Sequence, residues 1–221
     1  MRETVIREIE EHKLIVIARG VARNQLAPLG EALYEGGVRF LEITYQTDGS
    51  ITDDETEENI RLLSETFCGR LFVGAGTVLT PLQVERTARA GGTFVISPDT
   101  FEPVIRKTRE LGLVSIPGAM TPSEIQGANR AGADFVKLFP ASALGAAYVK
   151  DVLAPLSGLK ILAVGNIHKD DMREYLNAGV CGFGVGSAVV DREMIRKGDF
   201  DGIRELAGAY VNAACSFRRN A

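Results

Sequence analysis

The chain has 221 residues, of which 45% are hydrophobic, enough to bury a large core in one α/β barrel or in two small domains. Its formal net charge is -4 at pH 7 and no block of lysine and arginine is present, so nucleic acid is not expected as a partner. No stretch approaches the roughly 20 apolar residues of a membrane span, and the charged start does not resemble a secretory signal, so we expect a cytoplasmic protein with no membrane partner.

Cysteine and histidine spacing excludes two further classes of site. The three cysteines, Cys68, Cys181 and Cys215, lie far apart and are odd in number, which fits neither a disulfide framework nor a zinc site. The two histidines, His12 and His168, are joined by no acidic cluster with ligand spacing. We therefore expect thiols of a reducing compartment, no metal and no cofactor.

Short apolar runs alternate with helical patterns along the whole chain, which is typical of βα units and a parallel sheet. An amphipathic helix is expected near residues 2–11. The strands expected after it are residues 14–18, 38–44, 71–74, 93–97, 113–117, 134–139, 160–164 and 182–186. The helices expected between and after them are residues 24–35, 54–66, 81–90, 101–111, 122–131, 147–153, 170–178 and 200–217.

Eight strands and eight following helices have the count and size of a compact (β/α)8, or TIM, barrel with an extra N-terminal helix. Glycines at residues 36–37, 91–92, 132 and 179 end a helix just before the second, fourth, sixth and eighth strands, as expected of one βαβα unit used four times. We expect residues 1–221 to form a single barrel domain. An open doubly wound sheet is the alternative.

Two of the expected strands carry an ionisable residue in their interior, Glu42 in the second and Lys137 in the sixth. Side chains alternate along a strand, so Lys137 shares a face with Phe135 and Phe139, and Glu42 turns into the barrel with Phe40. Both residues then point into one barrel. A structural salt bridge is one interpretation of this pair, and a nucleophile with a general acid/base is the other.

Lys137 is the more unusual of the two because burying an ammonium group is costly and usually ends in loss of the proton. A neutral amine in an apolar setting is a nucleophile for carbonyl carbon. Alternatively, its stem packs in the core while its head reaches water at the strand end. The other charged strand residues, Arg39, Asp134 and Lys160, stand at strand starts, where we expect them to reach solvent at the bottom of the barrel.

Glycines follow the last two expected strands, where barrels commonly bind phosphate through backbone amides. Gly165 and Asn166 come after the seventh strand, and Gly186 and Ser187 after the eighth. Tight turns alone are the other interpretation of these glycines. The longest irregular loop, residues 45–53, follows the second strand and lies at the same end of the barrel, where active sites are built.

Taken in order, these segments resemble the family of 2-keto-3-deoxy-6-phosphogluconate (KDPG) aldolase and 4-hydroxy-2-oxoglutarate (KHG) aldolase, of the class I Schiff-base type, over about residues 14–187. The motifs that carry the resemblance are GGVRFLEIT (36–44), GAGTV (74–78), ISP (96–98), IPGAMTPSE (116–124), VKLFPA (136–141) and GVGS (184–187). The resemblance implies a homotrimer and a 2-keto acid substrate, in most cases phosphorylated.

By this resemblance Lys137 is the Schiff-base lysine and Glu42 the proton-transfer residue. The positions that it places around the substrate are Arg19, Thr77, Pro98, Phe139, Gly165, Asn166, Gly186 and Ser187. The implied reaction is cleavage of KDPG into pyruvate and glyceraldehyde 3-phosphate, whose phosphate the last four positions would hold. The alternatives are an aldolase for KHG or for the 6-phosphogalactonate epimer, and a phosphate-binding barrel without catalysis.

Two positions depart from the family pattern and bear on the substrate. Many members have arginine after Glu-Ile-Thr, where it binds the substrate carboxylate, and this chain has Gln46. The carboxylate then depends more on Arg19 and Thr77. The usual Thr-Gly-Gly after the seventh strand is replaced by a segment ending in Asn166, and asparagine tolerates a positive φ, so an amide cradle is expected to survive.

Overall fold

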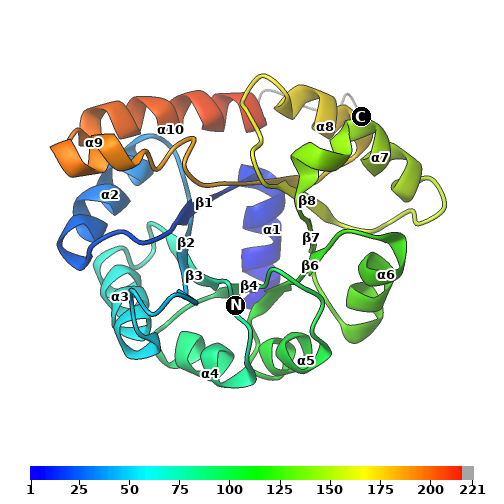
Figure 1. Ribbon diagram of the computed structural model, residues 1–221, viewed down its shortest axis with the longest axis horizontal. Coiled ribbons are helices and arrows are strands. Elements are labelled where there is room, and N and C mark those ends of the chain that lie inside the picture. The colour runs from blue at the N-terminus through cyan, green and yellow to red at the C-terminus, as the bar shows by residue number, and fades with distance from the viewer. Residues whose placement is uncertain (216–221) are drawn as a thin grey trace.

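Parallel strands form a nearly closed barrel surrounded by helices in the computed structural model, which describes residues 1–215 (Figure 1). The strands are β1 (Leu14–Ala18), β2 (Phe40–Thr44), β3 (Phe72–Gly76), β4 (Phe94–Ile96), β5 (Val114–Ile116), β6 (Gly118–Ala119), β7 (Val136–Leu138), β8 (Ile161–Val164) and β9 (Gly182–Val185). The helices are α1 (Arg2–His12), α2 (Arg23–Glu35), α3 (Asp53–Thr66), α4 (Pro81–Arg89), α5 (Glu102–Glu110), α6 (Pro122–Ala131), α7 (Ala141–Leu153), α8 (Met172–Ala178), α9 (Arg192–Lys197) and α10 (Phe200–Cys215).

The sheet closes through β5, which lies within the fifth predicted strand, and β6, which follows Pro117 and was not predicted. The strand order is β5-β4-β3-β2-β1-β9-β8-β7-β6, so the two ends of the sheet are consecutive segments of the chain joined by Pro117. Proline has no N–H to donate, which breaks the ladder at this point. The carbonyl of Pro117 still accepts a 2.8 Å hydrogen bond from the N–H of Lys137. The (β/α)8 prediction is confirmed, and an open doubly wound sheet does not form.

Alternation along the strands divides the core into two hydrophobic clusters. Leu41 and Ile43 belong to the cluster between the strands and the helices, and Phe40 belongs to the cluster inside the barrel. There the ring of Phe40 stacks on Phe72 at 4.9 Å between centroids and meets Phe94 at 5.9 Å. Glu42 therefore points into the barrel, as predicted from the two-residue period.

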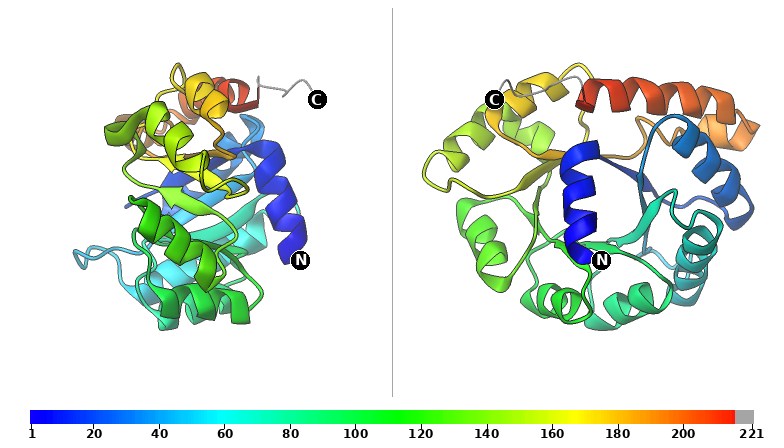
Figure 2. Two further views of the ribbon diagram at one scale, coloured as in Figure 1. Left: turned by 90° about the vertical axis from the view of Figure 1, so that its right-hand side faces the viewer. Right: turned by 180° about the vertical axis from the view of Figure 1, so that it is seen from behind.

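Helix α1 lies across one end of the barrel, as the view from behind in Figure 2 shows. Its buried residues are Val5, Ile6 and Ile9, which join the inner cluster. The carboxyl ends of the strands lie at the other end. The loop after β2, drawn in light blue, projects there in the side view (Figure 2).

The expectation that Asp134 reaches solvent is wrong because α1 covers the bottom of the barrel. The Asp134 side chain is 4% exposed and forms ion pairs with Arg2 of α1 at 2.5 Å and with Arg109 at 2.6 Å. It also accepts a 3.0 Å hydrogen bond from the N–H of Ser115. Lys160 stays 38% exposed at the side chain.

Helix starts and ends follow local signals where the sequence carries them. Thr80 and Thr121 form complete capping boxes before proline, as does Thr52 before α3. The glycines predicted to end helices before β2, β4, β7 and β9 include four with the positive φ of a left-handed turn: 91° at Gly37, 84° at Gly91, 102° at Gly132 and 110° at Gly179.

Two helical segments differ from the prediction. α7 begins at Ala141, six residues early, and continues across Gly145, whose φ is 79°. α9 was not predicted. Of the last predicted helix, residues 216–217 lie outside the described residues. Within the described part, no helix is long and apolar enough to cross a membrane.

Candidate active site

A cavity of about 1100 Å³ opens at the carboxyl ends of the strands. Parallel barrels place their reactive side chains at this end, because the loops that follow the strands meet there. The cavity is lined by every residue that the sequence singled out: Arg19, Glu42, Thr77, Pro98, Lys137, Phe139, Gly165, Asn166, Gly186 and Ser187. The structure thus brings together residues from seven strands or their following loops.

Lys137 lies in the middle of β7 with 7% of its surface exposed. Its Nζ atom is 4.8 Å from the centroid of the Phe139 ring, and among the described residues it has no hydrogen-bond or ion-pair partner. Burial lowers the pKa of Lys137, the negative charge of Glu42 opposes this, and Arg19 adds to the lowering. The site therefore makes the neutral amine easier to form than it is for a lysine in water.

Glu42 faces Lys137 from β2 and is 1% exposed. Its Oε2 is buried with no hydrogen-bond partner in the described structure, and no direct ion pair joins it to Lys137. Burial raises the pKa of Glu42, while the charges of Lys137 and Arg19 lower it. Gly76 makes room for this carboxyl group, since a Cβ there would lie 1.5 Å from Oε1 of Glu42. The arrangement is not a structural salt bridge, because an unpaired amine and an unpaired carboxyl group face one cavity.

Two contacts place the loops after β1, β3 and β4 around the lysine. Arg19 donates a hydrogen bond from Nη2 to Oγ1 of Thr77 at 2.9 Å, and Thr77 has a φ of 56°. Pro98 approaches β6 so closely that a Cβ on Gly118 would lie 2.3 Å from the Pro98 carbonyl oxygen. Gly118 is the register partner of Lys137, so the Pro98 main chain comes near the lysine.

The ends of β8 and β9 present free backbone donors. Gly165 and Asn166 have φ values of 103° and 52°, so the expected positive φ at asparagine is confirmed. In the described part of the chain, the backbone N–H groups of Asn166 and Ser187 have no acceptor. Phe139 packs beside this segment, 3.2 Å from where a Cβ of Gly165 would be. Free backbone N–H groups that line one cavity can bind an anion.

Gln46 lies on the cavity wall at the start of the loop after β2. Its Nε2 donates hydrogen bonds of 3.0 Å to the carbonyl of Thr44 and 2.7 Å to Oγ1 of Thr44. Both amide hydrogens are thus occupied by Thr44 at the end of β2. As predicted from the sequence, this position offers no charge to a carboxylate.

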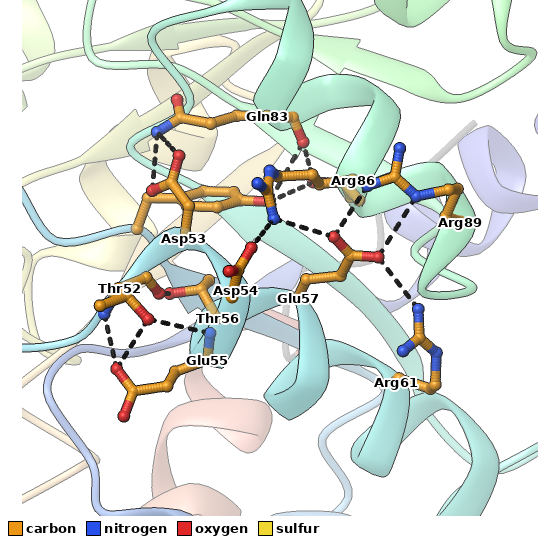
Figure 3. Close-up of polar contacts among 12 residues, drawn as sticks. Thr52, Asp53, Asp54, Glu55, Thr56, Glu57, Arg61, Gln83, Arg86 and Arg89 are labelled. Atoms are coloured by element: carbon orange, nitrogen blue, oxygen red, sulfur yellow. Dashed lines mark hydrogen bonds and ion pairs between the residues drawn. The ribbon is translucent and has the colours of Figure 1, made fainter.

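A polar network between α3 and α4 holds the loops after β2 and β3 in place (Figure 3). The hydroxyl of buried Tyr45 donates to the carbonyl of Gln83 at 3.1 Å, and Nε2 of Gln83 donates to both carboxylate oxygens of Asp53 at 3.2 Å. Burial raises the pKa of Tyr45 to about 12, so its hydroxyl remains a donor. Glu57 adds an ion pair of 3.2 Å with Arg86. The loop after β2 is therefore anchored at both of its ends, at Tyr45 and Asp53.

Sequence reasoning missed several side chains that line the cavity: Gln25, Asp48, His168, Arg192 and Arg196. The two arginines lie on α9. A signal for this helix was present, because Asp191 is an N-cap residue and Gly198 is its left-handed C-cap. No group of three or more His, Cys, Asp or Glu side chains among the described residues is placed to hold a metal ion.

Comparison with known proteins gives consistent matches over most of the chain. The sequence model of the family described as "Aldolase: KDPG and KHG aldolase" matches residues 5–206. A probable 2-dehydro-3-deoxy-6-phosphogalactonate aldolase of Rhizobium meliloti (strain 1021) is 37% identical over 180 residues, which are 81% of this chain and 82% of the relative. A KHG/KDPG aldolase of Escherichia coli (strain K12) is 34% identical over 189 residues, 85% of each chain.

A solved structure of high similarity is the KDPG aldolase of Legionella pneumophila with pyruvate captured as a covalent carbinolamine intermediate. Its TM-score is 0.83 and its sequence identity 28%, over 95% of this chain and 98% of that one.

Proposed function

The chain belongs to the KDPG and KHG aldolase family, and from this premise we propose that it is a class I aldolase whose Schiff-base lysine is Lys137. As a member of the family it is a carbon–carbon lyase. The observation that carries the proposal is the buried, unpartnered Lys137, whose pKa burial lowers and which shares the cavity with Glu42. The carbinolamine that pyruvate forms in the Legionella relative supports covalent chemistry without a metal.

In the proposed reaction, neutral Nζ of Lys137 attacks the 2-keto carbon of the substrate, and loss of water gives an iminium ion. Glu42 accepts the proton of the C4 hydroxyl through a bridging water. The electrons of the C3–C4 bond flow into the iminium, and the aldehyde leaves. The enamine that remains is protonated at C3 and hydrolysed, which releases pyruvate and restores the amine.

We propose KDPG as the substrate, with glyceraldehyde 3-phosphate as the second product. The free N–H groups of Asn166 and Ser187, together with Gly165 and Gly186, are suited to a phosphate. The substrate carboxylate would lie at Arg19 and Thr77, since Gln46 is neutral and already bonded to Thr44.

Two other substrates of the same class have support from relatives. The Rhizobium relative points to the 6-phosphogalactonate epimer, and the Escherichia coli relative to KHG. A barrel that binds phosphate without catalysis would need neither Lys137 nor Glu42, so we favour the enzyme. We further propose a cytoplasmic homotrimer, which sedimentation equilibrium of the full chain tests.

The test is a panel of KDPG, its phosphogalactonate epimer and KHG, with pyruvate release followed by lactate dehydrogenase. We expect pyruvate from both phosphorylated acids with higher kcat/KM than from KHG, and none with Lys137→Met. A folded wild-type chain that releases pyruvate from none of the three would contradict the proposed function.

A further inference from the structure

Helix α9 brings two arginines to the cavity that also holds the free backbone donors. Arg192 and Arg196 line the same cavity as Asn166 and Ser187. Arg196 is engaged by Glu193, with 2.8 Å between Nη2 and Oε2. Arg192 is exposed and has no acidic partner within residues 1–215. It is therefore a cation that lines the cavity and is not neutralised by a neighbour.

The backbone that carries Arg192 is fixed on both sides. Ile195 of the same helix is 6% exposed, and its carbonyl accepts a 2.9 Å hydrogen bond from Nε2 of Gln25 in α2. Oδ1 of Asp191 accepts a 2.9 Å hydrogen bond from the N–H of Met194. Because these contacts hold the backbone on both sides of Arg192, little backbone ordering is required when its side chain meets an anion.

The other cations that line the cavity are committed elsewhere. Arg19 donates to Thr77 near the lysine, and Lys137 lies deep in the barrel. The backbone amides of Asn166 and Ser187 supply only partial charges, whereas a phosphate monoester carries close to two negative charges at neutral pH. A guanidinium group matches phosphate geometry with two parallel hydrogen bonds.

We propose that Arg192 binds the phosphate group of the substrate and sets the preference of the enzyme for phosphorylated over unphosphorylated 2-keto acids. The proposal rests on the proposed function, which supplies the substrate class. It assigns the phosphate end of the substrate to the segment of the cavity between the ends of β8 and β9 and helix α9. The carboxylate end then lies toward Arg19.

The test compares Arg192→Gln with Lys197→Gln, a matched control because Lys197 is exposed on the same helix and does not line the cavity. The measured quantity is the ratio of kcat/KM for KDPG to that for its unphosphorylated analogue. We expect this ratio to fall about tenfold in Arg192→Gln, as for loss of one charge-assisted hydrogen bond. We expect partial recovery in Arg192→Lys and no change in Lys197→Gln. An unchanged ratio in Arg192→Gln, or an equal fall in the control, would overturn the proposal.

A binding measurement separates this proposal from the proposed function. Calorimetric titration of inorganic phosphate into the Lys137→Met chain, with and without Arg192→Gln, needs no chemistry at the lysine. We expect the second substitution to weaken phosphate binding about tenfold. Equal affinity in the two chains would refute the role of Arg192, even if the wild-type chain cleaves every substrate in the panel.

Discussion

Substitution of Gly76 by alanine moves the Glu42 carboxyl group while leaving every ionisable residue in place. A Cβ at Gly76 would lie 1.5 Å from Oε1 and 2.3 Å from Cδ of Glu42. Atoms do not approach this closely, and Glu42 is 1% exposed, so its carboxyl group has to rotate to another position inside the barrel. The proton-transfer group is then displaced with respect to Lys137.

The loss of activity follows from the size of the catalytic effect that is removed. General acid–base catalysis contributes about 10²–10⁴-fold, so we expect kcat/KM to fall about 100-fold or more. The displaced atoms are the end of a flexible side chain, and overpacking of this kind costs about 1 kcal/mol, at the low end of its usual range.

Gly74→Ala is the matched control, because Gly74 lies two residues away on the same face of β3. A Cβ there would lie 2.5 Å from both the ring and the carbonyl oxygen of Phe94, and it does not meet Glu42. Because the backbone of Phe94 cannot move aside easily, Gly74→Ala should lose more stability in urea denaturation than Gly76→Ala does. It should lose less activity per folded molecule than Gly76→Ala. The reasoning is refuted if Gly76→Ala keeps wild-type kcat/KM, or if both variants lose activity in proportion to stability.

Three further substitutions test the electrostatics of the barrel. Burial lowers the pKa of Lys137, so the unfolded chain holds that proton more tightly than the folded chain does. Lys137→Met removes this unfavourable contribution and should raise the Tm at pH 7. The gain in Tm should shrink as the pH rises toward 10.5, the ordinary pKa of lysine. Burial raises the pKa of Glu42 above its ordinary value of 4.5. In a pH profile of the wild-type chain, kcat/KM should therefore begin to fall on the acid side at a pH above 4.5, and Glu42→Gln should not show this acid-side decrease. Asp134→Asn removes the charge that Arg2 and Arg109 share and should cost about 2 kcal/mol in urea denaturation. A loss below about 0.5 kcal/mol would show that this ion-pair network does not stabilise the fold.

The strand pattern predicted the architecture and the central pair of residues because both depend on local rules. Apolar runs separated by helical segments specify a parallel barrel, and a period of two places Glu42 and Lys137 on inward faces. The positive φ at Asn166 was also predictable from residue type. These features needed no knowledge of which residues meet in space.

The features that were missed depend on tertiary contacts. Asp134 stands at a strand start, where solvent is the usual environment, and only the placement of α1 and Arg2 over the barrel makes it buried. The additional strand β6 after Pro117 pairs with β7, whereas β5 before it pairs with β4, and sequence alone does not reveal this change of partner. The position of Arg192 depends on how Gln25 and Ile195 hold α9 against the barrel.

The covalent role of Lys137 is tested most directly by trapping. The full chain is incubated with pyruvate, reduced with borohydride and digested, and the modified peptide is identified by mass spectrometry. We predict a carboxyethyl group on Nζ of Lys137 and none in the Lys137→Met chain. A preparation that cleaves substrate but yields no adduct at Lys137, or an adduct at another lysine instead, would contradict the account.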